Sequence, residues 1–592
     1  MKREIRSNTV VSTSGVGAVV DVGQESFVIP GITEWKQYQL RVIELRRLSR
    51  RLRKVLKGPK EEKPTLMVRR FPRAMFCEKC RRIQYWSTKL ERENRVPQCP
   101  QDGCTGSLVP MRFVTACEGG HLGDVKWSFW AHSGQHGNRS CRANDQLQFE
   151  VDTKAETAGL GSLVVRCALC RSWRSLEDLA SKQIVKETFR KCEGMHPWRP
   201  NQPEDCDCDV VVLQRGATNL HYPVGISALD IPLLATESPE EQFASQVMAH
   251  GKFDRLLGLM KSTKGANDEL IEMILENVAT AVGCEMSVVR SIVEAAAEGH
   301  SFATGEEAAD EAVDQLALLK EEWKTLSEAL SLGALESATF VAVAEELSPQ
   351  SPDWLKRLVN GALLIRRLRE VRAYLGFQRV KPDADRTVPP DVGGDEKWLP
   401  AVEVFGEGIV LSLDFDRLEA WAQHLPETER AKLQDLEEKR LTENFWFLPK
   451  VHPIQIALHT LVHLLLRRIT FECGYSSSSL KERLYFDATE RYAAIMIYTA
   501  DADSEGSLGG LVRQGRRDRF AATVIEALDQ GEWCSADPVC SETAGQGLGG
   551  FNHAACHACS LVSETSCTSA NTLLDRRLLY NKEWGLLPMM GR

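Results

Sequence analysis

The stretch Cys77-Glu78-Lys79-Cys80, followed by Cys99-Pro100-Gln101-Asp102-Gly103-Cys104, decides how the first third of this chain folds. Each pair of cysteines can sit on a tight turn that presents two sulfurs to one ion, and Gly103 suits such a turn. A hairpin between the pairs would bring four thiolates together around tetrahedral Zn²⁺. The spacing therefore predicts a zinc-ribbon-like module, with an iron–sulfur cluster as the chemical alternative.

A second cysteine group lies further along the chain. Cys167 and Cys170 repeat the two-residue spacing of the first knuckle. Three cysteines follow at looser spacing, so the choice of partners stays open. We expect Cys192 and Cys206 to complete a second zinc site, with Cys208 as a substitute for Cys206.

A third cysteine group lies near the C-terminus, where five thiols compete for four positions. The expected zinc ligands are Cys540, Cys556, Cys559 and Cys567. This choice leaves Cys534, which follows Trp533, as the spare thiol, although Cys534 and Cys540 can exchange roles. His553 and His557 are further alternatives. The Cys-x2-Cys pair within the group predicts a third zinc site.

A fourth, looser pattern consists of Cys117, His121, His132 and Cys141. These residues fit either a mixed zinc site or ordinary packing without metal. The sequence thus predicts two to four Zn²⁺ ions per chain.

Composition places the cysteines in a reducing compartment. The chain has 592 residues, 18 cysteines and a net charge of −9, and 43% of its residues are hydrophobic. Neither a secretory signal nor a membrane-spanning apolar run is seen, so we expect a cytoplasmic protein without membrane contact. Disulfides are rare in the cytosol, which favours metal ligation of the clustered thiols.

The pattern of elements predicts a multidomain, mixed α+β protein. Four regions are expected: N-terminal strands with a basic helix in 1–70, a cysteine-rich zinc-binding region in 71–236, a helical region in 237–380, and an α/β domain with a zinc cluster in 398–592. Within the last two regions, residues 353–376 are expected to form a helix and residues 492–499 a strand.

The predicted basic helix, at residues 38–57, is the strongest positive patch of the chain. Its candidate nucleic-acid or partner contacts are Arg46, Arg47, Arg50, Arg51, Arg53 and Lys54. Such a density of cations suits phosphate or an acidic partner surface, although a solvated helix face is the plainer interpretation.

Motifs of catalysis are missing. The sequence has no GxxxxGK[ST] phosphate loop, so ATP hydrolysis is not expected. His459 and His463 have the spacing of zinc proteases, but Thr460 replaces the required Glu. Residues 501–505 resemble the start of a calcium loop that lacks its last ligand. Residues 506–512 read as a glycine turn entering a helix, whose first amides can hold an anion.

Several segments together resemble one family. They include the segments at 12–21, 113–117, 215–219, 368–372, 407–408, 506–510, 556–559 and 574–576. The chain resembles the DrmB family, the zinc-binding components of DISARM anti-phage defence. The resemblance implies a prokaryotic, non-catalytic subunit that joins a separate DrmA-like superfamily 2 DNA helicase in a complex and helps it engage foreign DNA. It also maps the family's C-terminal cysteines onto Cys540, Cys556, Cys559 and Cys567.

Two other functions remain open from the sequence. A metal-dependent nuclease or DNA-modifying enzyme would use His459, His463 and residues 501–505. A structural scaffold would make no DNA contact. The oligomeric state, the docking surface and the form or methylation of the DNA are not encoded in any recognisable motif.

Overall fold

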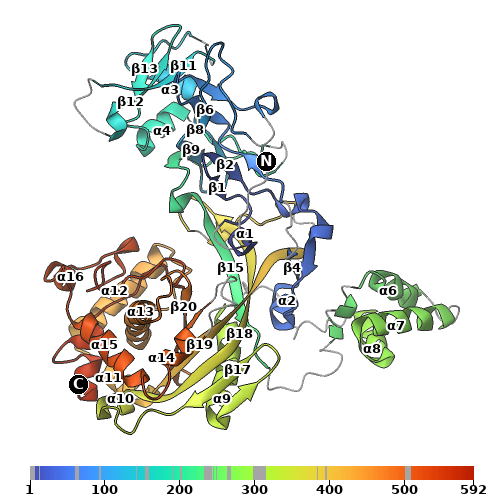
Figure 1. Ribbon diagram of the computed structural model, residues 1–592. Coiled ribbons are helices and arrows are strands. Elements are labelled where there is room, and N and C mark those ends of the chain that lie inside the picture. The colour runs from blue at the N-terminus through green and yellow to red at the C-terminus, as the bar shows by residue number, and fades with distance from the viewer. Residues whose placement is uncertain are drawn as a thin grey trace. The chain divides into compact units, whose positions relative to one another are not determined.

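The computed structural model describes residues 7–11, 14–60, 66–91, 95–141, 143, 145–153, 159–189, 191–199, 203–232, 243–244, 246–248, 250–262, 268–297, 315–382, 384–393, 396–499 and 509–592. Two compact units interleave along the chain (Figure 1). Unit 1 comprises residues 1–43, 56–226 and 372–402, and unit 2 comprises residues 44–55, 227–371 and 403–592.

Unit 1 is built from small antiparallel sheets of short strands, and three of these four sheets carry cysteines in or beside their turns. The sheets are β1(Val19–Val22)-β2(Glu25–Val28)-β5(Arg69–Arg70), β7(Ile83–Tyr85)-β6(Ala74–Cys77)-β8(Leu108–Pro110), β10(Leu122–Asp124)-β9(Phe113–Ala116)-β14(Val211–Gln214) and β11(Leu147–Val151)-β12(Leu163–Cys167)-β13(Trp173–Ser175). Its helices are α1(Ser7–Val11), α3(Trp127–Ser133) and α4(Lys182–Phe189), with short 3-10 turns at η1(Ile32–Glu34), η2(Gln37–Gln39), η3(Thr88–Leu90), η4(Gly159–Ser162), η5(Thr218–Leu220) and η6(Ala384–Arg386). The side chains of Trp127 and Trp130 on α3 are fully buried in its core.

Unit 2 is organised around a sheet with the strand order β16(Ala334–Glu336)-β17(Val341–Glu345)-β18(Val359–Gln378)-β19(Trp398–Leu413)-β21(Tyr492–Thr499)-β20(Leu480–Asp487). The unit boundary falls inside the long strands β18 and β19. β15(Tyr222–Leu229) pairs with β18, while β4(Val55–Pro59) pairs with β19 and β3(Leu40–Val42). The strand expected at residues 492–499 is β21.

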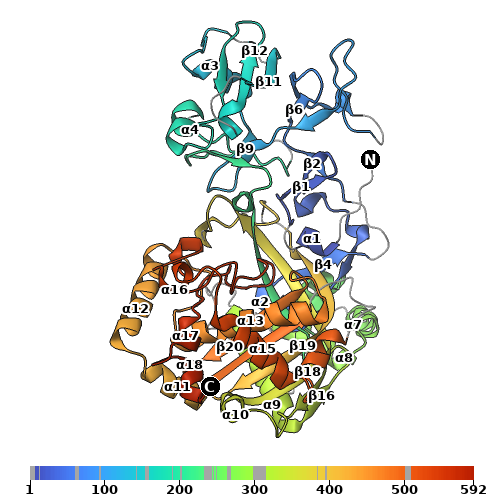
Figure 2. The ribbon, with the colours of Figure 1, turned by 60° about the vertical axis from the view of Figure 1, so that its left-hand side comes forward.

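The helices of unit 2 are α2(Arg46–Leu52), α6(Phe253–Ser262), α7(Asp268–Val282), α8(Met286–Ala297), α9(Gln315–Leu332), α10(Asp353–Leu358), α11(Phe415–Gln423), α12(Glu427–Thr442), α13(Pro453–Cys473), α14(Gly510–Gln514), α15(Phe520–Glu532), α16(Val539–Glu542), α17(Arg577–Tyr580) and α18(Leu586–Met590), with a 3-10 turn at η7(Leu548–Gly550). Helices α6, α7 and α8 share a small core of their own. Helix α13 (Figure 2) is buried throughout residues 456–466, and α11, α14, α15 and α17 contact it.

Neighbouring residues of β20 show which helix covers which face of the sheet. Successive side chains of a strand point to opposite faces. Glu482 faces the histidines of α13, whereas the next residue, Arg483, pairs with Glu322 of α9 at 2.8 Å. Helices α13 and α9 therefore cover opposite faces of the sheet.

The predicted helix at 353–376 is wrong beyond its first turn. Residues 353–358 are helical as α10, but residues 359–378 form strand β18. Arginines on one side and Leu, Val and Ile on the other suggested an amphipathic helix. Buried positions instead run almost continuously along β18 because it is covered on both faces, as in a central strand. The basic Arg366 and Arg367 are its exposed pair. The expected helical region 237–380 thus also contains β16, β17 and all of β18.

The predicted basic helix at 38–57 is also wrong in extent. Its residues form β3, the seven-residue helix α2 and the start of β4. Arg53 ends the helix in a left-handed conformation, with φ at 51°. The broader expectation of a multidomain fold with mixed helices and strands is confirmed. Among the described helices, none has the length and apolar character that crossing a membrane requires.

Candidate metal centres

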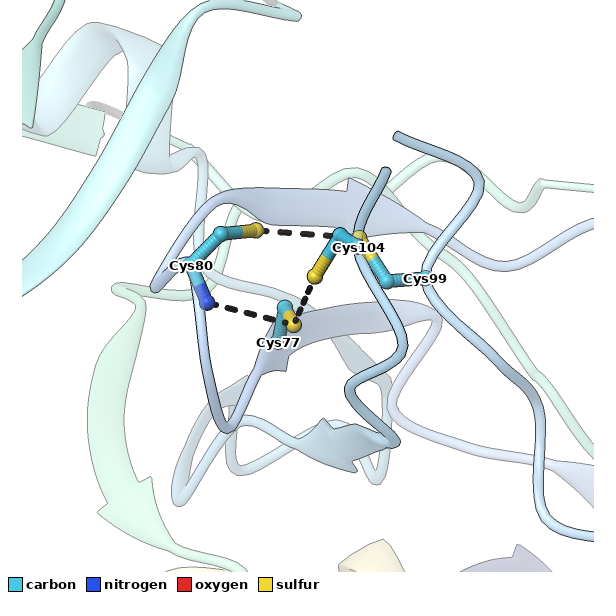
Figure 3. A group of neighbouring side chains, drawn as sticks. All are labelled: Cys77, Cys80, Cys99 and Cys104. Atoms are coloured by element: carbon cyan, nitrogen blue, oxygen red, sulfur yellow. Dashed lines mark hydrogen bonds between the residues drawn. The ribbon is translucent and has the colours of Figure 1, made fainter. Parts of the chain in front are cut away.

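Cys77, Cys80, Cys99 and Cys104 converge as the spacing predicts (Figure 3). The Sγ atoms of Cys77 and Cys104 lie 3.5 Å apart, and those of Cys80 and Cys99 lie 3.7 Å apart. Four sulfurs about 2.3 Å from a tetrahedral Zn²⁺ would lie about 3.8 Å from one another. The cluster therefore has the size of a zinc site.

The backbone around this first cluster is shaped to present sulfur. The amides of Lys79 and Cys80 both donate to Cys77 Sγ at 3.4 Å, as in a tight knuckle. A side chain at Gly106 would place its Cβ 2.5 Å from Cys77 Sγ, so only glycine allows this approach. The amide of Gly106 lowers the pKa of the Cys104 thiol to about 7, which favours the thiolate that a metal requires.

A second cluster joins the Cys167/Cys170 knuckle to His132 and Cys141. His132 lies at the end of α3, which packs on β12 and β13. Its Nδ1 contacts the carbonyl oxygen of Ser128 at 2.6 Å, while its buried Nε2 has no hydrogen-bond partner among the described residues. Such a carbonyl contact commonly orients a metal-binding imidazole.

The thiol of Cys170 is also prepared for ligation. Burial tends to raise its pKa, but hydrogen bonds from the hydroxyl and backbone amide of Ser172 outweigh burial and lower the pKa to about 6. A thiolate is therefore available near neutral pH.

A third cluster consists of Cys117, His121, Cys192 and Cys206. Cys117 Sγ lies 3.3 Å from His121 Nδ1 and 3.9 Å from Cys206 Sγ. The grouping differs from the sequence expectation, in which Cys192 and Cys206 completed the Cys167/Cys170 site. The physical reason is strand pairing: β9 and β14 are antiparallel with Ala116 opposite Val211, which brings the residues after β9 beside those before β14.

The C-terminal cluster consists of Cys534, Cys540, Cys556 and Cys559. The Sγ–Sγ distances are 3.6 Å between Cys534 and Cys556, 3.8 Å between Cys540 and Cys559, and 3.8 Å between Cys556 and Cys559. Cys534, expected to be the spare thiol, is part of the set. Cys567, expected to be a ligand here, lies instead with His459, His463 and Glu482.

An arginine balances the charge of the C-terminal cluster. Four thiolates around Zn²⁺ carry a net charge of −2. The guanidinium of Arg576, almost fully buried, lies 3.9 Å from Cys540 Sγ and is held by Asp537 at 3.1 Å and by the carbonyl of Ala554 at 2.9 Å. A buried cation at this position lowers the cost of burying the anionic cluster.

The basic segment, residues 46–54, packs mostly against other residues of unit 2. Arg47 Nη2 lies 2.9 Å from Glu322 Oε1, and Arg51 pairs with Glu321 at 2.5 Å. The guanidinium of Arg46 lies over the ring of Phe243. Of the six basic residues singled out in the sequence, Arg53 is exposed to solvent and the other five are half-buried.

The glycine turn expected to hold an anion binds a carboxylate of the protein itself, that of Glu407. The amides of Gly509 and Leu511, at the start of α14, each donate to the buried carboxylate of Glu407 at 2.7 Å. Tyr475 donates to the same carboxylate at 3.0 Å. The calcium-like residues 501–505 and the start of the turn, 506–508, lie outside the described residues.

Four thiolate-rich clusters on two α/β units define a multidomain zinc-binding protein. Residues 461–560 match a family model described as the MrfA Zn-binding domain, and residues 6–222 match a Domain of unknown function (DUF8724). Over 578 residues the chain is 29% identical to the DISARM protein DrmB of Bacillus paralicheniformis (strain ATCC 9945a / NCIMB 11709 / CD-2), a match that covers 95% of this chain and 97% of that protein. The resemblance to DrmB is therefore confirmed, and zinc is the cofactor that the domain match and the clusters indicate.

The matched zinc-binding domain ends at residue 560. It contains all four members of the C-terminal cluster and stops before Cys567. Its extent thus agrees with the grouping in the structure.

Proposed function

We propose that this protein is a cytoplasmic, non-catalytic component of a DISARM-type anti-phage system, which docks on a superfamily 2 DNA helicase and helps it engage foreign DNA. The observation that carries the proposal is the end-to-end similarity to a DISARM protein, which covers 95% of the chain. The zinc-binding domain within residues 461–560 supports it.

The form of the metal clusters supports a non-catalytic role. Each of the four thiolate-rich clusters supplies four protein ligands, whereas catalytic zinc keeps a position open for water or substrate. When bound, zinc would cross-link these turns and stabilise the folded units. The residues of the clusters hold the ion and shape the surrounding surface rather than activate a water molecule.

The nuclease alternative has little support in the described residues. His459 and His463 are 2% and 0% exposed, so a phosphodiester cannot reach either imidazole. The acidic residues 501–505 that would complete such a site lie outside the described residues.

The decisive experiment is co-expression of the full chain with a DrmA-like superfamily 2 helicase from the same organism. We expect the two proteins to co-purify, and the isolated chain to show neither ATP hydrolysis nor cleavage of labelled DNA in Mg²⁺ or Mn²⁺. Failure to bind the helicase would overturn the proposal. DNA cleavage by the pure chain that is lost in His463→Ala would favour the nuclease instead.

Direct DNA contact within the complex is assigned to the exposed part of the basic segment, at Arg53. Arg53→Glu should weaken DNA binding by the complex and reduce the slope of log K against log salt by about 1. The matched control is Arg430→Glu, which changes an arginine with 48% side-chain exposure on α12. If Arg53→Glu and Arg430→Glu changed the DNA affinity and its salt dependence equally, a scaffold that makes no DNA contact would describe the protein better.

A further inference from the structure

Four buried polar side chains meet between α13 and β20, apart from the thiolate-rich clusters. They are His459 and His463 of α13, Glu482 of β20, and Cys567. One donor atom from each lies within 4.8 Å of all the others. The exposed fractions of these residues are 2%, 0%, 0% and 8%, so water does not solvate the group.

The surrounding backbone orients all four donors toward a common centre. His459 Nδ1 contacts the carbonyl of Leu573 at 3.2 Å, and His463 Nδ1 contacts that of Ser560 at 2.9 Å. An imidazole whose Nδ1–H is donated to a carbonyl keeps a lone pair on Nε2, as metal-binding histidines do. Both Nε2 atoms face Glu482.

The sulfur of Cys567 is held as a thiolate would be. The backbone amides of Ser569 and Asn571 donate to Cys567 Sγ at 3.3 and 3.2 Å. Two N–H donors aimed at one sulfur favour its anionic form. The amide of Thr568 donates to Glu482 Oε1 at 3.1 Å and fixes the carboxylate in the same turn.

The distances between these donors fit an ion better than direct hydrogen bonds. His459 Nε2 lies 3.2 Å from Glu482 Oε1 and 3.3 Å from Cys567 Sγ, and His463 Nε2 lies 3.3 Å from Glu482 Oε2. Charge-assisted N–H···O bonds are about 2.7–2.9 Å long. The edges of a tetrahedron of N, O and S ligands around Zn²⁺ are about 3.3–3.6 Å long.

Two atoms of the group face each other at 3.3 Å without a hydrogen bond. His463 Nε2 and Glu482 Oε2 are buried and make no hydrogen bond to a described residue. An unsatisfied buried polar atom destabilises the folded state, and a charged one does so more strongly. An ion at the centre would satisfy both atoms at once.

We propose that His459, His463, Glu482 and Cys567 form a further Zn²⁺ site that closes helix α13 onto strand β20. One carboxylate and one thiolate balance the charge of Zn²⁺, so the loaded site is neutral. This agrees with the described residues, among which no arginine pairs with the group, in contrast to Arg576 beside the C-terminal cluster. Four protein ligands in a buried position make it a structural site, independent of any helicase or DNA.

The alternative occupant of the centre is protons alone. Two imidazolium groups facing a carboxylate and a thiolate would also balance charge, without metal. Metal content separates the two states, because the proton network releases no zinc.

The test measures zinc per chain in the purified full-length protein by plasma mass spectrometry. The four thiolate-rich clusters account for four ions and the proposed site for a fifth. Glu482→Gln and Cys567→Ser should each lower the content by one ion. Cys473→Ser, a matched change of a cysteine at the end of α13 outside the five clusters described above, should leave it unchanged. An unchanged content in both Glu482→Gln and Cys567→Ser would overturn the proposal.

A second measurement uses the wild-type chain, in case the variants fail to fold. An anomalous difference map at the zinc absorption edge should show a peak enclosed by these four side chains. A peak that appears only at the iron edge, or no peak while the thiolate-rich clusters are loaded, would overturn the proposed zinc site.

Discussion

Cys534→Ser tests which thiols form the C-terminal zinc cluster. Structural zinc binds with an apparent free energy of about 10–16 kcal/mol, which averages about 2.5–4 kcal/mol per ligand. Losing the Cys534 thiolate, whose Sγ lies 3.6 Å from that of Cys556, should therefore weaken this site by about 10²–10³-fold in dissociation constant. A folded domain is stable by only about 5–15 kcal/mol, so this loss is a large share of the total. Residues 533–562, which surround the weakened zinc site, should therefore unfold locally more often.

The assay combines zinc release to a chromophoric chelator with amide hydrogen exchange. In Cys534→Ser, one ion should pass to the chelator early, and amides in residues 533–562 should exchange faster. In Cys567→Ser, exchange should instead rise around residues 459–463 and 480–487. Cys473→Ser serves as the control for both. The reverse result, with residues 533–562 loosened by Cys567→Ser and unaffected by Cys534→Ser, would refute the grouping.

Three further outcomes are expected. Arg483→Met should destabilise unit 2 by about 3–5 kcal/mol, because it removes the buried cation that pairs with both Glu322 and Glu370. Arg491→Met, at a half-exposed pair, should cost less than about 1 kcal/mol, and urea unfolding compares the two variants. Burial lowers the pKa of His221 to about 3, so its neutral form stabilises unit 1 above roughly pH 6.5 and this contribution is lost as the pH falls toward 3. The unfolding midpoint of His221→Gln should therefore fall less than that of the wild-type chain between these pH values. An equal fall in both proteins would contradict the assignment. Chelation of zinc at neutral pH should speed exchange at the cysteine turns but not in α6–α8, whose described residues hold none of the four thiolate-rich clusters.

The short-spaced cysteine pairs could be predicted from the sequence, but the distant residues that complete a metal site could not. The knuckles at Cys77/Cys80 and Cys167/Cys170 depend only on a tight turn, which two-residue spacing encodes. The first cluster also closes within one hairpin-sized segment, so its four members could be named. Which distant cysteine joins a knuckle depends on strand pairing, such as Ala116 of β9 opposite Val211 of β14. A single sequence carries no signal for that register.

Charge was harder to interpret than cysteine, because a charged side chain has the same appearance in sequence whether it is buried or solvated. Arg47 looked like part of a solvated basic helix, but it pairs with Glu322, 275 positions away. The arginine and aliphatic residues of 353–376 were likewise interpreted as two faces of a helix, but β18 is a strand that is buried along nearly its whole length.

His459 and His463 are the case in which sequence reasoning came closest without succeeding. Their spacing placed both imidazoles on one face of a buried helix, and the missing Glu argued against a protease. The carboxylate is present after all, but it comes from Glu482 on the adjacent strand. Together with Cys567, this carboxylate and the two imidazoles form a closed set of four donors. Because that set is neutral with Zn²⁺ and buried, it belongs to the machinery that holds the fold. The groups available to a partner are therefore those on the surfaces that the metal clusters stabilise, not the clusters themselves.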